Sequence, residues 1–119
     1  EKAKAEAQKA LEAARKQGDS LIEKADATAK TIRDEATKAA TKLREEADKR
    51  AEQLIVEGKK KGMIGERFAT EAAKKIREEA DKKASLLERE ADQKASKLQA
   101  EAKTKADALI KEAERKAGN

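Results

Sequence analysis

The residues of this chain that could do chemistry are carboxylates and amines, and they recur at a regular spacing. One series of acids recurs every eleven residues and comprises Glu79, Glu90, Glu101 and Glu112. Each of these acids is followed four residues later by a lysine. Acid-first pairs at this spacing stabilise a helix by about 0.2–0.5 kcal/mol each. A catalytic carboxylate would need a desolvated pocket that shifts its pKa, and the surrounding residues offer nothing to build one. The pattern therefore indicates helix-stabilising surface charge.

The composition leaves out most of the side chains on which enzymes depend. The 119 residues include no Cys, His, Trp, Tyr or Pro. The chain therefore has no thiol nucleophile, no imidazole base and no means of forming a Cys/His zinc cluster. We predict that it is not an enzyme, with no catalytic, cofactor-binding or metal-ligating residue and no cofactor.

The same composition narrows the fold class. Leu, Ile, Val and Phe together fill only 16 positions, which is too few for a β-sandwich, an α/β fold or a globin-like core. Ala, Glu, Lys, Arg and Leu fill 83 of the 119 positions. Most of these are strong helix formers, so an all-α protein is predicted.

Three series of residues repeat every eleven positions along the whole chain. The first small track holds only Ala or Gly, at residues 7, 18, 29, 40, 51, 62, 73, 84, 95, 106 and 117. The large track is mostly Leu or Ile, at residues 10, 21, 32, 43, 54, 65, 76, 87, 98 and 109. The second small track is again Ala or Gly, at residues 3, 14, 25, 36, 47, 58, 69, 80, 91, 102 and 113. Eleven residues over three turns predict a narrow seam and a nearly straight, hendecad-type coiled coil.

A cluster of three glycines near the midpoint predicts a turn between two helices. Gly58, Gly62 and Gly65 each cost a helix about 1 kcal/mol relative to Ala. We expect a single helical-hairpin domain over residues 1–119, with helices at 2–57 and 66–117 and a Gly-rich turn at 58–65. If the residue numbers of facing positions add up to 123, every large-track residue opposes a second-small-track residue, as dense packing requires. The glycines also keep the repeat in frame, so a continuous rod is the alternative.

Two smaller features leave alternatives open. Gly18, Asp19 and Ser20 predict either a kink or close contact at 18–20, or the end of a short separate first helix. Met63, Ile64 and Phe68 lie beside the glycines. They are expected to plug the end of the hairpin, and the alternative is a docking site.

The seam resembles two groups of eleven-residue-repeat proteins. Its repeating unit is small, large and small, as in Ala29, Ile32 and Ala36 or in Ala84, Leu87 and Ala91. This unit is similar to the coiled-coil region of peripheral-stalk b-type subunits of rotary ATP synthases, which would imply an elongated tether. The Ala, Lys, Glu and Thr content of residues 30–40 also resembles late-embryogenesis-abundant proteins. That likeness would imply a link to desiccation and membrane protection.

Charge and hydropathy bear on partners and on location. The net charge is +5, and Lys59, Lys60 and Lys61 supply three of these charges, while elsewhere the signs alternate. Alternating signs favour a solvated helix surface and disfavour nucleic acid as a partner. We expect a soluble fragment, either cytoplasmic or exported with its signal segment removed.

The predicted function is a structural coiled-coil spacer or scaffold, with reversible lipid-surface binding as the alternative. A homodimer is expected, since side chains beside the seam would be covered by self-association; these are Leu11, Ile22, Ile55, Leu86 and Ile110. The coiled-coil surface is a further candidate site for a protein partner.

Overall fold

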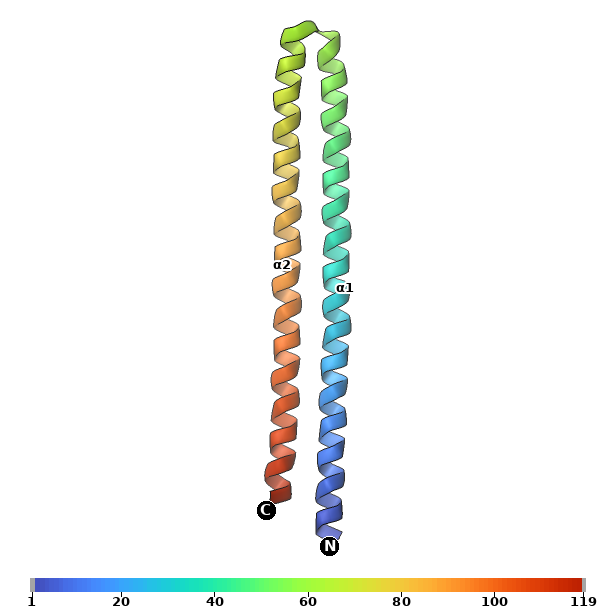
Figure 1. Cartoon of the computed structure of the whole chain (residues 1–119), viewed down its shortest axis with the longest axis vertical. Coiled ribbons are helices and arrows are strands. Elements are labelled where there is room, and N and C mark those ends of the chain that lie inside the picture. Colours follow the sequence, from blue (N-terminus) through green and yellow to red (C-terminus); the bar gives the residue numbers. More distant parts are fainter. Residues whose placement is uncertain (1, 119) are drawn as a thin grey trace. The chain divides into compact units, whose positions relative to one another are not determined.

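The computed structural model describes residues 2–118 and is all-α, as predicted. Helix α1 runs from Lys2 to Lys60 and helix α2 from Gly62 to Gly118. Within the chain, contacts group the residues into two compact units. Unit 1 combines α1 up to Ile32 with α2 from Asp92, and unit 2 comprises Arg33–Ala91. In each unit the two helices form an antiparallel pair, so the predicted helical hairpin is confirmed (Figure 1).

The connection between the helices is much shorter than the predicted turn at 58–65. Lys61 is the only residue between α1 and α2, and its backbone N–H donates a hydrogen bond of 3.0 Å to the carbonyl oxygen of Gly58. Gly62 has φ +89°, a left-handed conformation that side chains with a Cβ disfavour. Because the chain reverses at Lys61 and Gly62, the flanking glycines Gly58 and Gly65 remain helical.

Gly58 and Gly65 instead let the two helices approach closely in unit 2. A Cβ added to Gly58 would lie 2.8 Å from the carbonyl oxygen of Gly65 and would overlap the Cβ of Ala69. A Cβ added to Gly65 would lie 2.9 Å from the carbonyl oxygen of Gly58. Gly58 and Gly65 are therefore packing positions, and the bend lies at Lys61 and Gly62.

Helix α1 continues through Gly18, Asp19 and Ser20, so there is no separate first helix. The alternative of close contact describes this region instead. A Cβ placed on Gly18 would lie 3.1 Å from the Cβ of Ala106, across unit 1. At this point glycine fits because the opposing helix is near.

The first small track lies between the helices in both units. Gly18 on α1 faces Ala106 on α2. Moving eleven residues forward along α1 and eleven residues back along α2 places Ala29 opposite Ala95, and both are completely buried. In unit 2 the same register makes two further small pairs, Ala40 with Ala84 and Ala51 with Ala73, and all four are completely buried. The buried hydrophobic side chains of residues 2–118 are all alanines. The predicted large-to-small pairing thus describes only the layer beside this alanine seam.

The large track lies at the edge of the seam and is incompletely buried. Leu43 and Ile76 are half-buried and line one shallow depression with Ala47 and Ala80, as the predicted register requires. Leu87 is 38% exposed. The hairpin therefore covers its large apolar side chains only in part, because alanines hold the helices close together at the centre.

Spin labels in unit 1 would test the hairpin directly. Ala3 and Ala117 line the same depression, so labels at these positions should report a distance set by the helix spacing of about 8–10 Å. In a continuous rod the same labels would be about 170 Å apart. The labelled chain is diluted into an excess of unlabelled chain, so that only intramolecular distances are measured. Loss of the short distance on dilution would contradict the hairpin.

Candidate interaction surfaces

The described part of the chain holds no constellation that resembles a metal site. Within residues 2–118, Asp and Glu side chains do not gather in groups of three that could hold an ion. Neither described helix contains a stretch that is both long and apolar enough to cross a membrane. The surfaces that remain are the polar contacts between the helices, the shallow depressions along them and the end of unit 2.

The predicted acid-first pairs form at one position of the series. Glu112 accepts a hydrogen bond of 3.2 Å from Arg115 and lies 3.9 Å from the ammonium of Lys116. All three side chains are more than half exposed, so solvent screens these contacts. The structure puts shorter ion pairs between the helices.

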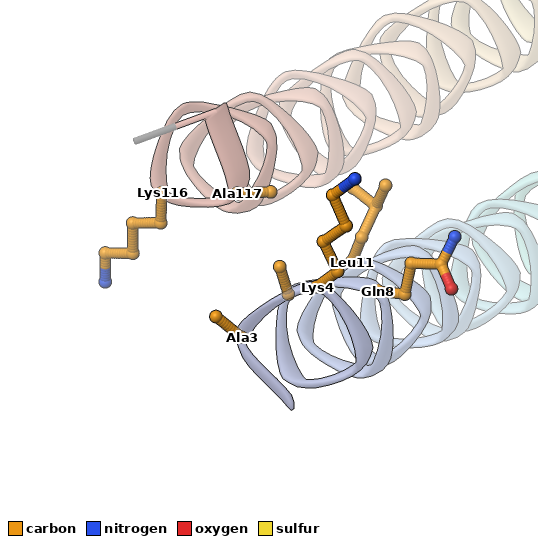
Figure 2. Close-up of a pocket in the computed structure, with 7 residues that line it drawn as sticks. Ala3, Lys4, Gln8, Leu11, Lys116 and Ala117 are labelled. Carbon is orange, nitrogen blue, oxygen red and sulfur yellow. The ribbon is translucent and has the colours of Figure 1, made fainter. Parts of the chain in front are cut away.

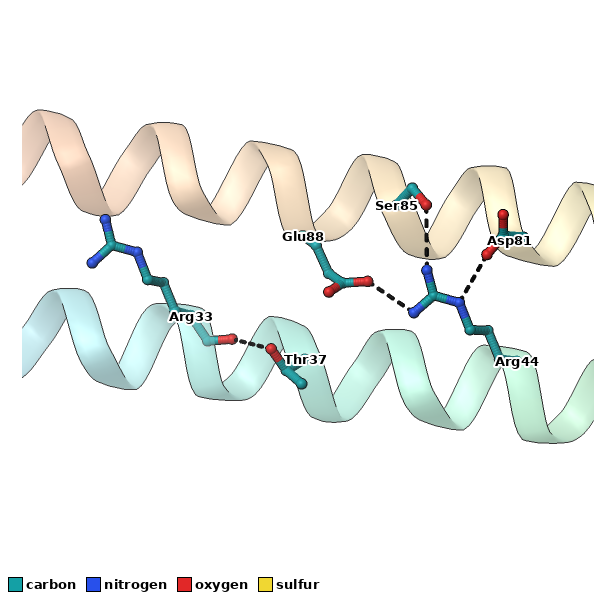
Figure 3. A network of polar contacts seen from close by, with 6 residues as sticks. All are labelled: Arg33, Thr37, Arg44, Asp81, Ser85 and Glu88. Carbon is teal, nitrogen blue, oxygen red and sulfur yellow. Dashed lines mark hydrogen bonds and ion pairs between the residues drawn. The ribbon is translucent and has the colours of Figure 1, made fainter.

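Arg44 joins the two helices of unit 2 through a fork of three hydrogen bonds. Its guanidinium donates to Glu88 at 2.8 Å, to Asp81 at 3.0 Å and to Ser85 at 3.3 Å (Figure 3). The hydrogen bonds to Glu88 and then to Asp81 raise the pKa of Arg44 above its ordinary value. Because the pKa of Arg44 is higher in the folded state than in the unfolded state, the contacts stabilise the fold fully at a pH below the unfolded-state pKa. This stabilisation is lost only as the pH rises through the folded-state pKa. Arg44 therefore stays charged except in strong alkali.

Related cross-helix contacts occur in both units at the same register. Arg77 donates to Asp48 at 3.1 Å in unit 2, and the Gln99 amide donates to Asp26 at 2.9 Å in unit 1. Arg44, Arg77 and Gln99 belong to a fourth eleven-residue series, the multiples of eleven, which includes Leu11, Ile22, Ile55 and Ile110. These four apolar members, expected beside the seam, are half-buried within the single chain. The sequence signal for these cross-helix contacts was the eleven-residue spacing of the arginines. A search for charge pairs within each helix alone does not detect it.

Replacing Arg44 with lysine would measure what the fork contributes. Lysine keeps the charge but presents one ammonium, which cannot span two carboxylates as a planar guanidinium does. We expect the melting temperature to fall by a few degrees at most, because the partners are exposed enough to be screened. The difference should shrink at high salt. Arg50→Lys, at an exposed position on α1, is the matched control. Identical melting of both variants at low salt would show that the fork is energetically neutral.

The depressions along the helices are shallow; those near the helix ends in unit 1 are lined mainly by alanine and aliphatic carbon, and one on α1 in unit 2 is lined mainly by charged side chains such as Lys49, Glu52 and Glu57. One of about 340 Å³ lies between the helix ends in unit 1, with Leu11 and Ala117 at its edge and Lys116 extending away from it (Figure 2). Its polar side chains are Lys4, Gln8 and Lys116. A site for general acid–base chemistry needs a group whose pKa is shifted by burial, and this lining has no carboxylate or imidazole.

The apolar side chains next to the bend do not plug the end of the hairpin. Met63 is 88% exposed, Ile64 is 74% exposed and Phe68 is 71% exposed. The expectation that they seal the helix ends was therefore wrong. Gly58 and Gly65 bring the backbones into contact, which leaves no space between the helices for larger side chains.

Comparison with known proteins identifies no relative. The chain matches no protein-family model, no curated protein and no solved structure.

Proposed function

We propose that the chain is a non-catalytic structural module, a helical hairpin of hendecad type that serves as a spacer or scaffold. The observation that carries this proposal is the seam, in which completely buried alanines repeat every eleven residues in each unit. Such a seam holds two helices at a fixed close spacing without enclosing a cavity. The cross-helix contacts of Arg44 and Arg77 add orientation to it. All of these features serve to hold a shape, and none of them serves to bind a small molecule.

Self-association belongs to this proposal, and the register suggests its form. The first small track faces itself in reverse order, and Gly62 stands at its centre. If both copies formed one straight helix through Gly62, each copy could offer the other the same partners as in the hairpin. Ala84 of one copy would face Ala40 of the other, and Ala106 would face Gly18. A short connection of this kind favours exchange of helices between chains. The homodimer would then be an antiparallel pair of long helices that keeps the contacts of the hairpin.

The exposed leucines offer a weaker route to the same dimer. Leu86 is 52% exposed and Leu87 is 38% exposed. Covering them on two chains contributes roughly 4 kcal/mol, at about 2 kcal/mol for each fully buried leucine. An energy of about 4 kcal/mol corresponds to millimolar affinity before the costs of association are subtracted. Exchange of whole helices is therefore the stronger candidate.

The alternative function, binding along a lipid surface, would require the seam to open. Most of the large-track side chains that would enter the lipid are half-buried between the helices instead, while Leu87 and Leu109 are 38% and 37% exposed. Circular dichroism with and without anionic vesicles distinguishes the two functions. A preformed spacer should show high helix content and cooperative melting in buffer and no gain with vesicles. A weakly helical spectrum in buffer that becomes helical on vesicles would overturn the spacer and favour the alternative.

A further inference from the structure

The end of unit 2 carries the most exposed large apolar side chains of the described residues. We call Met63, Ile64 and Phe68 the tip cluster; Met63 is the one methionine of the chain and Phe68 its one aromatic residue. Ile64 and Phe68 are one helical turn apart on α2 and share one face, while Met63 lies about 100° around the helix from Ile64 in the first turn. Elsewhere the large apolar side chains mostly lie against the opposite helix.

Four cations surround the tip cluster. Lys59, Lys60, Lys61 and Arg67 are all exposed, and only one acid, Glu66, lies within residues 58–68. Lys59 and Lys60 can stabilise the C-terminal end of α1. The first turn of α2 has no acidic residue, although a helix N-terminus favours negative charge. An external anion would therefore meet the lysines and also the N-terminus of α2, whose partial positive charge is not balanced by any carboxylate in the first turn of that helix.

We propose that the tip cluster inserts into the surface of an anionic phospholipid bilayer, while Lys59, Lys60, Lys61 and Arg67 contact the lipid phosphates. Apolar insertion to a depth of about 5–10 Å together with basic contacts is the combination by which proteins bind anionic membranes. The rise from Met63 to Phe68 is about 7–8 Å, so the whole cluster fits within that depth.

The size and shape of the cluster favour a bilayer over a protein partner. A stable protein interface covers about 800 Å² on each side and needs a matched surface. Three projecting side chains on the first turns of one helix provide much less than this area. A bilayer needs no matching pocket, because acyl chains close around whatever enters. A second copy of the chain would bring eight cations of residues 58–68, four from each copy, against one another.

A tryptophan at the tip would report insertion, because the chain has none of its own. Phe68→Trp should shift its emission to the blue when vesicles containing phosphatidylglycerol are added, and brominated lipid should quench it. Vesicles of phosphatidylcholine alone should have little effect. Leu86→Trp is the control, at an exposed position away from the tip. A blue shift of Leu86→Trp on the same vesicles would overturn the tip proposal in favour of binding along the helix.

Two sets of substitutions separate the apolar and the basic contributions. Ile64→Ser with Phe68→Ser should weaken vesicle sedimentation at least tenfold, since it removes most of the inserted apolar surface. Lys59→Gln, Lys60→Gln and Lys61→Gln together should weaken it about fivefold per lysine. Lys74→Gln, Lys75→Gln and Lys82→Gln form the control, which removes the same charge from exposed positions further along α2. Measured along α2 from Phe68, these lie about 9–21 Å away, where salt screens most of their effect.

Each outcome decides the proposal. Circular dichroism checks that every variant keeps its helix content, as expected for substitutions at exposed side chains. Equal loss of binding in both lysine sets would show non-specific attraction of the whole surface and would overturn a tip site. Undiminished binding of the Ile64→Ser, Phe68→Ser variant, with displacement by free inorganic phosphate, would assign the lysines to a soluble anion instead. The spacer proposed above would survive either result, because it does not depend on lipid.

Discussion

Gly62→Ala is expected to convert the hairpin into a dimer of straight helices. In the hairpin Gly62 has φ +89°, which costs an alanine about 1–2 kcal/mol. In a continuous helix the same substitution is favourable by about 1 kcal/mol. The two effects add in each chain, so the dimer gains roughly 4–6 kcal/mol. The association constant should therefore rise about a thousandfold or more.

Sedimentation equilibrium over a range of concentrations measures this shift, together with the spin labels at positions 3 and 117. No atom outside the immediate chain neighbours lies within 4 Å of a Cβ added to Gly62, so a steric clash does not contribute. Gly118→Ala is the matched control, because that glycine also has free space and no positive φ. A monomeric Gly62→Ala protein that still shows the short label distance would contradict helix exchange.

Ala40→Leu should be among the most destabilising single substitutions in unit 2. Ala40 is completely buried, and so is Ala84, which faces it on the other helix. A leucine there adds three carbons at a contact with no free volume, so the helices must separate along neighbouring turns as well. Overpacking of this kind costs about 1–3 kcal/mol and sometimes more. For a chain of this size we expect the melting temperature to fall by roughly 10 °C.

Ala39→Leu provides the control for this substitution at the adjacent position. Ala39 is exposed, and leucine and alanine have similar helix propensities, so little change is expected. Thermal unfolding followed by circular dichroism compares the two variants under identical conditions. If both variants have the melting temperature of the wild type, Ala40 does not face the other helix and the assigned register is wrong.

Much of the fold followed from local regularities of the sequence. The absence of Pro and the abundance of Ala, Glu and Lys predicted helices, because helix propensity and i,i+4 contacts depend only on neighbouring residues. The eleven-residue period identified the face on which Ala40 and Ala84 lie. The three central glycines located the bend to within a few residues.

The details that decide the candidate surfaces depended on tertiary contacts. The length of the turn could not be read from Gly58 and Gly65, because a helix tolerates glycine when its neighbours pack closely. The fork of Arg44 arises from two carboxylates on the other helix, Asp81 and Glu88, 37 and 44 residues away. The exposure of the tip cluster follows from backbone contact that leaves no room beneath it.

The sequence by itself determined that the chain is helical, where it bends and which narrow stripe of each helix is apolar, since these properties follow from periodicity and propensity along one helix. The tertiary structure alone decided how close the helices come. Alanine facing alanine brings the backbones together, and that spacing moves the larger side chains outward. Four of the six leucines of the large track are therefore half-buried, Leu87 and Leu109 are more exposed, and Met63, Ile64 and Phe68 lie in solvent beside four cations.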